Sequence, residues 1–163
     1  MAPDPEALQN TLWSGTVNQT SLSELGGYLC AHREEITGEW LRAVERDAVI
    51  SSSDHLGYKE LVDHMPVLFQ DLAELLKSPQ SDPNHREVSR DARVHGKYRW
   101  RQGYRLEEVI REASIMRRIL FHNWIEAFAQ KVPAFDRETR KAAEHIIHDA
   151  VDDVVTDSAK QFV

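Results

Sequence analysis

Apolar residues repeat at helical spacing along most of the chain, and this pattern predicts an all-α fold. In the first half, Ser21 with Glu24 predicts a helix start of the capping-box type. A second helix is expected to end near Asp47. A third is expected from about residue 57 to Lys77, with a kink at Pro66, because proline removes a helical hydrogen bond. No stretch alternates apolar and polar residues as a strand does.

The second half predicts three further helical stretches. One runs from about residue 83 to 102 and ends at Gly103, and the next carries an apolar stripe from Leu106 to about Gln130. Asp136 is placed to cap a last helix that covers 136–163. We therefore expect a flexible lead-in over 1–19, followed by one helical domain over 20–163. The expected architecture is a bundle of five to six helices with a long C-terminal helix.

The last helix carries an apolar seam with a repeat close to 3.5 residues, the spacing of a coiled coil. The seam includes Ile147, Val151, Val154 and Phe162. No glycine or proline interrupts it, so this helix is predicted to pair with a second copy or to pass a signal onward. The alternative is an ordinary helix that the given sequence cuts short.

Composition narrows the classes of function. The net charge of -7 gives no basic face for nucleic acid or an anionic membrane, so neither partner is expected. With one cysteine, Cys30, no internal disulfide is possible, which favours the reducing cytoplasm. No apolar run approaches the ~18 residues of a membrane span.

Residues that could form a functional site lie between two predicted helices with strong apolar repeats. Asp91, His95 and Arg99 are spaced four residues apart and share one helix face. A buried guanidinium needs a partner, and Glu108 or Glu112 on the following helix is in position to supply it. Such a network either locks two helices together or orients a ligand and senses pH.

The histidines do not predict a metal site. His145 and His148 are three residues apart, but no second Glu-x-x-His pair completes a ligand set. One axial histidine suffices for haem, for which the candidates are His64, His95 and His122, so haem, another tetrapyrrole or a metal in the bundle stays an alternative. No phosphate loop, nucleophile elbow or His-Glu-x-x-His motif occurs, and no catalytic residue is predicted.

One segment resembles a known bacterial module. It reads His95-Gly96-x-x-Arg99-x-x-x-Gly103-Tyr104-x-Leu106-x-Glu108-Val109-x-x-Glu112-x-x-x-x-Arg117. This is similar to the N-terminal domain of RsbRD-type stressosome co-antagonists, which also stands at the front of many soluble sensor histidine kinases. The likeness covers roughly residues 21–160.

The resemblance implies a cytoplasmic sensory or regulatory input domain of globin-like architecture, commonly without haem. Such domains dimerise through terminal helices and feed an output module or a partner kinase. The residues expected to form the sensory or structural network are Asp91, His95, Arg99, Tyr104, Glu112 and Arg117. No phosphoacceptor box, ATP-binding box or STAS domain occurs in the 163 residues, so the output is left open.

Overall fold

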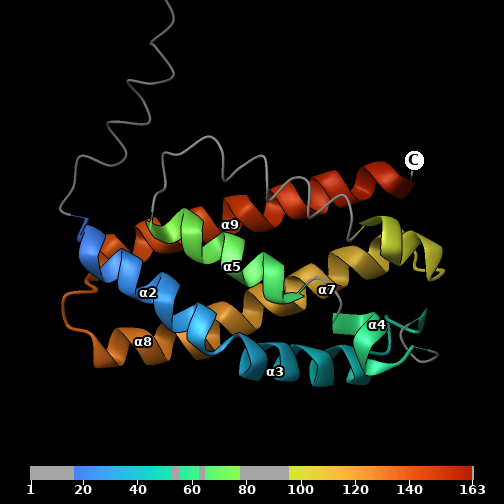
Figure 1. Cartoon of the computed structure of the whole chain (residues 1–163), viewed down its shortest axis with the longest axis horizontal. Coiled ribbons are helices and arrows are strands. Elements are labelled where there is room, and N and C mark those ends of the chain that lie inside the picture. The colour runs from blue at the N-terminus through green and yellow to red at the C-terminus, as the bar shows by residue number, and fades with distance from the viewer. Residues whose placement is uncertain (1–16, 53–55, 63–64, 78–95, 163) are drawn as a thin grey trace, which may run out of the picture.

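Helices make up the regular structure of the computed structural model, which describes residues 17–52, 56–62, 65–77 and 96–162 (Figure 1). No strand occurs within those ranges. The elements are α2 (Gln19–Ala31), α3 (Arg33–Arg46), α4 (Tyr58–Val62), α5 (Met65–Lys77), α7 (Leu106–Ile119), the π-helix η2 (Leu120–Ile125), α8 (Glu126–Lys131), α9 (Arg137–Ala159) and the 3-10 turn η3 (Lys160–Phe162). A helical segment over 96–101 precedes α7.

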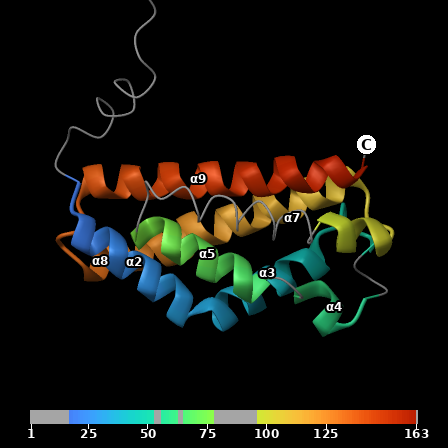
Figure 2. The same ribbon diagram turned by 45° about the horizontal axis from the view of Figure 1, so that its top comes forward.

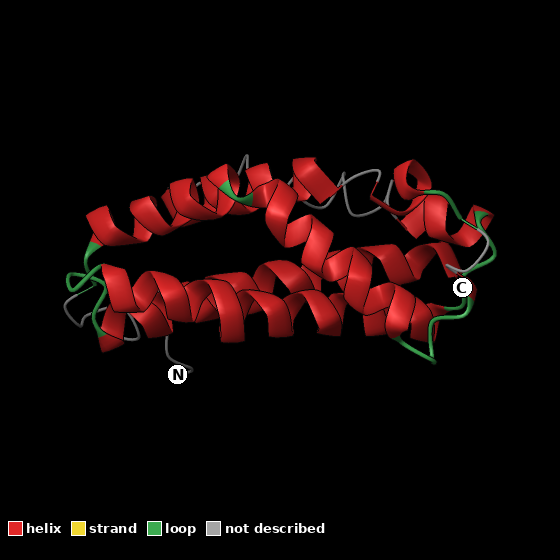
Figure 3. Ribbon diagram, turned by 90° about the horizontal axis from the view of Figure 1, so that it is seen from below, coloured by secondary structure: helices red, strands yellow, loops and turns green. Residues whose placement is uncertain are grey.

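The helices pack as a bundle, which confirms the predicted all-α class. In Figure 1, α9 runs along the top of the molecule, α3 and α8 lie along the bottom, and α5 and α7 lie between them. The turned view shows α9 as the longest rod, lying alongside α7 (Figure 2). Seen from below, the described part consists of helices joined by loops (Figure 3). Among the described residues, no helix combines the length and apolar character needed to cross a bilayer.

The first helix begins earlier than the sequence predicts. Asn18 is the N-cap of α2, because its side-chain oxygen accepts a hydrogen bond from the Ser21 N–H at 2.9 Å. Ser21 therefore lies inside the first turn, where its hydroxyl donates to the carbonyl of Asn18 at 3.1 Å. The prediction of a capping box that begins at Ser21 is wrong, since asparagine caps as well as serine does and stands three residues earlier.

The stretch predicted as one kinked helix contains α4 and α5, and residues 63 and 64 between them are outside the described ranges. Pro66 is the second described residue of α5. A kink at Pro66 within one longer helix depends on residues 63 and 64, so it stays a prediction.

Two further boundaries agree with the prediction. Asp136 caps α9 by accepting from the Thr139 N–H at 2.9 Å. The predicted helix from Leu106 runs on through η2 to the end of α8 at Lys131. The turn at Leu120–Ile125 has π geometry, which sequence periodicity alone does not reveal.

The interior is mainly apolar, but one of its largest buried side chains is charged. The close contact of α2 with α5 depends on Gly26, where an added Cβ would lie 2.8 Å from the carbonyl oxygen of Ala73. The largest fully buried side chains are Trp40, Leu22, Leu25, Leu29, Ile36, Ile50, Leu76, Leu120, Ile125, Ile147 and Arg99. A guanidinium among these residues requires compensation, and its surroundings form the candidate site.

Candidate functional site

Arg99 is positioned by the end of its own helical segment. The N–H of Tyr104 donates to the carbonyl of Arg99 at 3.0 Å, and that of Gly103 donates to Trp100 at 3.1 Å. Together with the positive φ of 82° at Gly103, these bonds form a Schellman motif. The motif folds Tyr104 back against Arg99, whose guanidinium carbon lies 4.8 Å from the ring centroid. Glycine is required here because a left-handed residue ends the helix.

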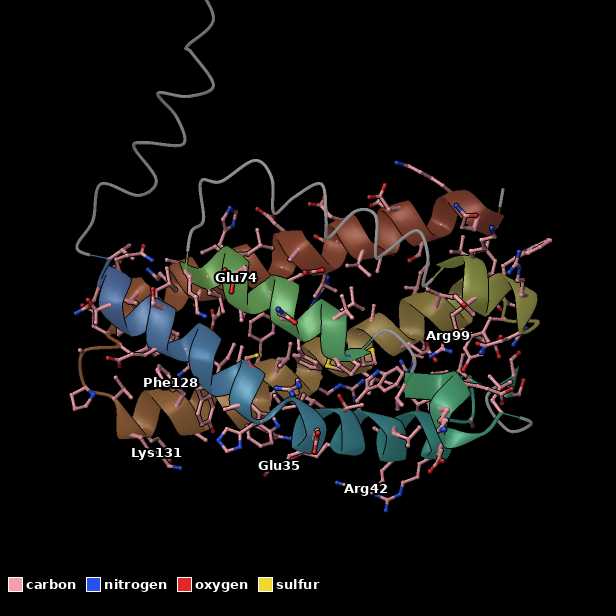
Figure 4. The ribbon with its side chains drawn as sticks, viewed as in Figure 1. Glu35, Arg42, Glu74, Arg99, Phe128 and Lys131 are labelled. Carbon is pink, nitrogen blue, oxygen red and sulfur yellow. The ribbon has the colours of Figure 1, made fainter. Side chains whose placement is uncertain are left out.

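The buried guanidinium is held by three acceptors. Its Nε donates to Glu112 Oε2 at 3.1 Å, and the side chains of Arg99 and Glu112 are only 1% and 3% exposed. Its Nη1 donates to the Glu60 carbonyl at 3.1 Å and to Gln102 Oε1 at 2.8 Å. Figure 4 labels Arg99 where the segment 96–101 meets α7. Arg99 thus joins α4, its own segment and α7 in one polar cluster.

The electrostatics of this cluster are those of a desolvated pair. Burial raises the pKa of Glu112, while the positive charge of Arg99 acts in the opposite direction. Burial, with the negative charge of Glu112 beside it, also raises the pKa of Tyr104. Desolvation offsets most of the attraction within such a pair, so its main effect is to hold one helix arrangement.

Glu112 is also tied to α3 through its backbone. The indole Nε1–H of Trp40 donates to the Glu112 carbonyl at 3.1 Å. Trp40 is 1% exposed, so this bond lies inside the core. A movement of Glu112 is therefore coupled to α3 as well as to the segment 96–101.

Glu108 does not pair with Arg99, although its spacing in the sequence allows that pair. It accepts instead from the backbone N–H groups of Ser51 and Ser52, each at 3.0 Å, and from the Ser52 hydroxyl at 2.7 Å. It also accepts from the Arg105 N–H at 2.8 Å, which caps α7. Burial alone would raise the pKa of Glu108, but the donors from Arg105 and Ser52 outweigh it and lower that pKa.

We expect Glu108→Gln to lower the free energy of unfolding by about 2 kcal/mol at neutral pH, because it weakens charge-assisted hydrogen bonds. The pKa of Glu108 is lower in the folded state than in the unfolded state. Its contribution to the free energy of unfolding is therefore present above the unfolded pKa of about 4.3 and is lost as pH falls through the folded pKa. The difference between the two proteins in urea unfolding should therefore shrink in acid. The exposed neighbour Glu107 supplies the control, and an E107Q loss equal to that of E108Q contradicts the assignment.

Gly96 brings the Arg99 segment against the end of α9. A Cβ at this position would lie 2.6 Å from the Ser158 Cα and 2.7 Å from the Ser158 carbonyl oxygen. Ser158 is fully buried and Asp157 is 6% exposed. Only glycine permits this backbone approach, so the Gly of the His-Gly-x-x-Arg motif serves helix packing.

An apolar cavity of about 90 Å³ lies beside the ion pair, between α3, α5, α7 and α9. Among the described lining residues Glu112 is the one charged residue, and α9 supplies four of these residues. The lining residues are Trp40, Met65, Leu68, Phe69, Leu72, Leu75, Val109, Glu112, Ala113, Met116, Leu120, Ala150, Val151, Val154 and Val155.

The structure brings together part of the predicted network. Arg99, Tyr104 and Glu112 form one cluster, whereas Asp91 and His95 lie outside the described residues. Arg117 is separate, because its guanidinium pairs with Asp152 on α9. Sequence reasoning missed the Glu60 carbonyl and the cavity, for which no local pattern gives a signal. It also missed Gln102, which the three-residue spacing from Arg99 could have indicated.

The predicted seam of α9 faces inward. Ile147 is fully buried in the core of its own chain, and Val151, Val154 and Phe162 pack against that core while keeping part of their surface exposed. The helix also does not run outward in the described residues, since it ends at Ala159 with Ser158 buried against Gly96. The prediction that these residues pair with a second copy therefore applies only to the partly exposed ones.

The histidines are dispersed. No group of three or more potential metal ligands occurs in the described part of the chain. His145 and Asp149 pair at 3.3 Å on the surface. His122 is exposed on η2 and does not line the apolar cavity, while His64 and His95 fall outside the described ranges. No described contact favours haem, and an absorption spectrum of the purified protein tests that alternative directly.

The family of the chain follows from a comparison over this region. The profile described as the RsbT co-antagonist protein rsbRD N-terminal domain matches residues 34–163. The chain belongs to this family. The match contains α3 through α9 and hence the complete Arg99 cluster, whereas α2 precedes it. The RsbRD resemblance was thus predicted correctly, although its expected start at residue 21 lies before the matched range. No curated protein and no solved structure matches the chain.

Proposed function

We propose that this RsbRD-type domain is the cytoplasmic signal-input domain of a bacterial regulatory protein. It acts as a homodimer and relays a stimulus to an output module such as a histidine kinase or a stressosome component. It works by binding and repacking rather than by catalysis. Family membership supports the input role, and the contact of Gly96 with Ser158 supports the relay.

The Gly96 contact carries the proposal because it joins two parts that a sensor must couple. Arg99 lies three residues after Gly96 and holds Glu112 on α7, while Ser158 lies in the last turn of α9. A repacking at the ion pair therefore moves the segment 96–101, which in turn contacts the end of α9. A stimulus shifts this arrangement only if it binds one packing better than the other.

We place the dimer contact on the partly exposed side of the C-terminal seam. Phe162 and Val154 keep some exposed surface, whereas Ile147 has none to offer. The outer residues of α9 include the charged Asp152 and Asp153, which disfavour a wholly apolar interface. The interface would then be small and would depend strongly on Phe162.

Size-exclusion chromatography with light scattering tests this arrangement. We expect the mass of two 18.8 kDa chains, and we expect Phe162→Ser to raise the dimer dissociation constant at least about tenfold through the loss of a buried aromatic ring. Gln161→Ser is the neighbouring control and should leave the constant unchanged. Circular dichroism verifies that both variants remain helical. A chain that stays monomeric at high concentration rules out the dimeric relay.

A further inference from the structure

The apolar cavity has the features of a ligand site rather than those of a packing defect at the edge of the fold. It lies between α3, α5, α7 and α9, and η2 adds Leu120 to its walls. The walls contain Met65 and Met116, whose unbranched side chains adapt to differently shaped occupants. Glu112, whose carboxylate pairs with Arg99, also lines this apolar space.

The size of the cavity limits the occupant. An apolar protein cavity of ~150 Å³ holds benzene, which has six carbon atoms. By that scale the volume of about 90 Å³ admits roughly four non-hydrogen atoms. A planar macrocycle does not fit such a space. A short aliphatic chain or a small branched molecule does.

The lining limits the chemistry further. Apart from Glu112, its residues are apolar, except that Trp40 uses its N–H on the Glu112 carbonyl. A carboxylate offers several lone pairs, so it accepts a hydrogen bond from a ligand in addition to the one from Arg99. An anionic ligand would place a second negative charge beside Glu112 in a desolvated site, which is strongly unfavourable.

We propose that the cavity binds a small uncharged amphiphile, with a short apolar body and one hydrogen-bond donor such as a hydroxyl group, and that the donor bonds to Glu112. The apolar body contacts Val151, Val154 and Val155 of α9. The polar group contacts the residue that pairs with Arg99. The role of this ligand as a stimulus rests on the proposed input function, whereas its binding to the cavity is measured separately.

The chain carries its own reporters for this binding. It contains three methionines, of which Met65 and Met116 line the cavity. In a protein with ¹³C-labelled methionine methyl groups, titration with n-propanol, which has four non-hydrogen atoms, should shift the signals of Met65 and Met116 in a saturable way. Ethyl methyl ether contains the same atoms but no donor, and acetate has the same number of non-hydrogen atoms but carries a negative charge. We expect the ether and acetate to bind at least tenfold more weakly than n-propanol.

Two substitutions localise the effect. Ala113→Leu adds three carbon atoms to the cavity wall and should weaken n-propanol binding at least tenfold. Ala129→Leu makes the same change on α8 at a similarly half-buried alanine outside the lining, and should leave the binding constant unchanged. Glu112→Gln should reduce the preference for n-propanol over the ether, because a neutral amide is a weaker acceptor than a carboxylate.

The outcomes separate the ligand class from the relay. Absence of saturable shifts with n-propanol, equal binding in A113L, or equal binding of the ether or acetate overturns the proposed ligand class. If n-propanol binds as expected but the amide signals of residues 156–162 do not change, the cavity assignment stands and the relay to the end of α9 fails. If n-propanol does not bind but the chain forms the Phe162-dependent dimer, the cavity assignment fails and the dimer stands.

Discussion

Replacing Arg99 by methionine is expected to lower the free energy of unfolding by about 3–5 kcal/mol at neutral pH, because it leaves Glu112 as a buried charge without its cation. Three acceptors lose the hydrogen bond from Arg99, namely Glu112, Gln102 and the Glu60 carbonyl, and the last of these keeps its bond from Gln102 Nε2. For a domain of this size the midpoint of thermal unfolding should fall by roughly 6–20 °C. Chemical denaturation monitored by circular dichroism measures the loss.

The loss in R99M should depend on pH in a defined direction. Burial already raises the pKa of Glu112, and removal of Arg99 takes away the charge that lowers it. A carboxyl group whose folded pKa is raised imposes no ionisation penalty below its unfolded pKa of about 4.3, and the penalty grows as pH rises through the folded pKa. R99M should therefore lose most stability near neutral pH and least near pH ~4.

Two comparisons make this prediction specific. Arg42→Met changes an exposed arginine that points away from the bundle in Figure 4, and should alter stability by no more than about 0.5 kcal/mol. Combining Arg99→Met with Glu112→Leu removes both charges and should recover much of the loss, as for other buried pairs replaced by apolar residues. An R99M loss as small as that of R42M refutes a structural role for the pair.

Gly96→Ala is expected to destabilise the fold by about 1–3 kcal/mol, because the added methyl group overlaps the backbone of Ser158. The nearest atoms are the Cα and the carbonyl oxygen, so the segment 96–101 must move away from α9. Hydrogen exchange should then accelerate at residues 155–160 more than at the start of α9. Urea unfolding with residue-resolved exchange measures both effects.

The matched control for this substitution should change the stability in the opposite direction. At Gly27 in α2 an added Cβ meets no atom within 4 Å, so Gly27→Ala should stabilise the protein by about 0.5–1 kcal/mol through helix propensity. Ser158→Gly should not rescue G96A, since the backbone overlap persists. A G96A variant that is as stable as G27A would show that the close approach does not exist in solution.

The sequence predicts the helices and one half of the ion pair well, because both depend on local spacing. Apolar repeats mark α3, α7 and α9, and the four-residue steps up to Arg99 identify a face on which a charge needs an acceptor. The choice between Glu108 and Glu112 was not predictable. It depends on Ser51 and Ser52, whose N–H groups occupy Glu108 and whose position is set by tertiary packing.

Local sequence pattern likewise could not predict which neighbour the C-terminal seam faces. A repeat near 3.5 residues fits both a partner helix and the core of the same chain. Ile147 and Ala150 are buried against neighbouring helices of their own bundle, so at those positions the seam belongs to the core of the same chain. The cavity requires four helices to be placed together before it exists, so no single segment encodes it.

The helix α9 is held firmly at its first turn. Asp136 caps its first turn, and the Thr139 hydroxyl accepts from the Asn18 N–H at 2.9 Å, which fastens this end to α2. From there 23 residues extend as a rod of roughly 35 Å. The cavity walls at 150–155 lie beyond the middle of that rod. In the proposed relay, a tilt of this rod about Thr139 would displace Ser158, which lies against Gly96, further than it displaces the cavity walls.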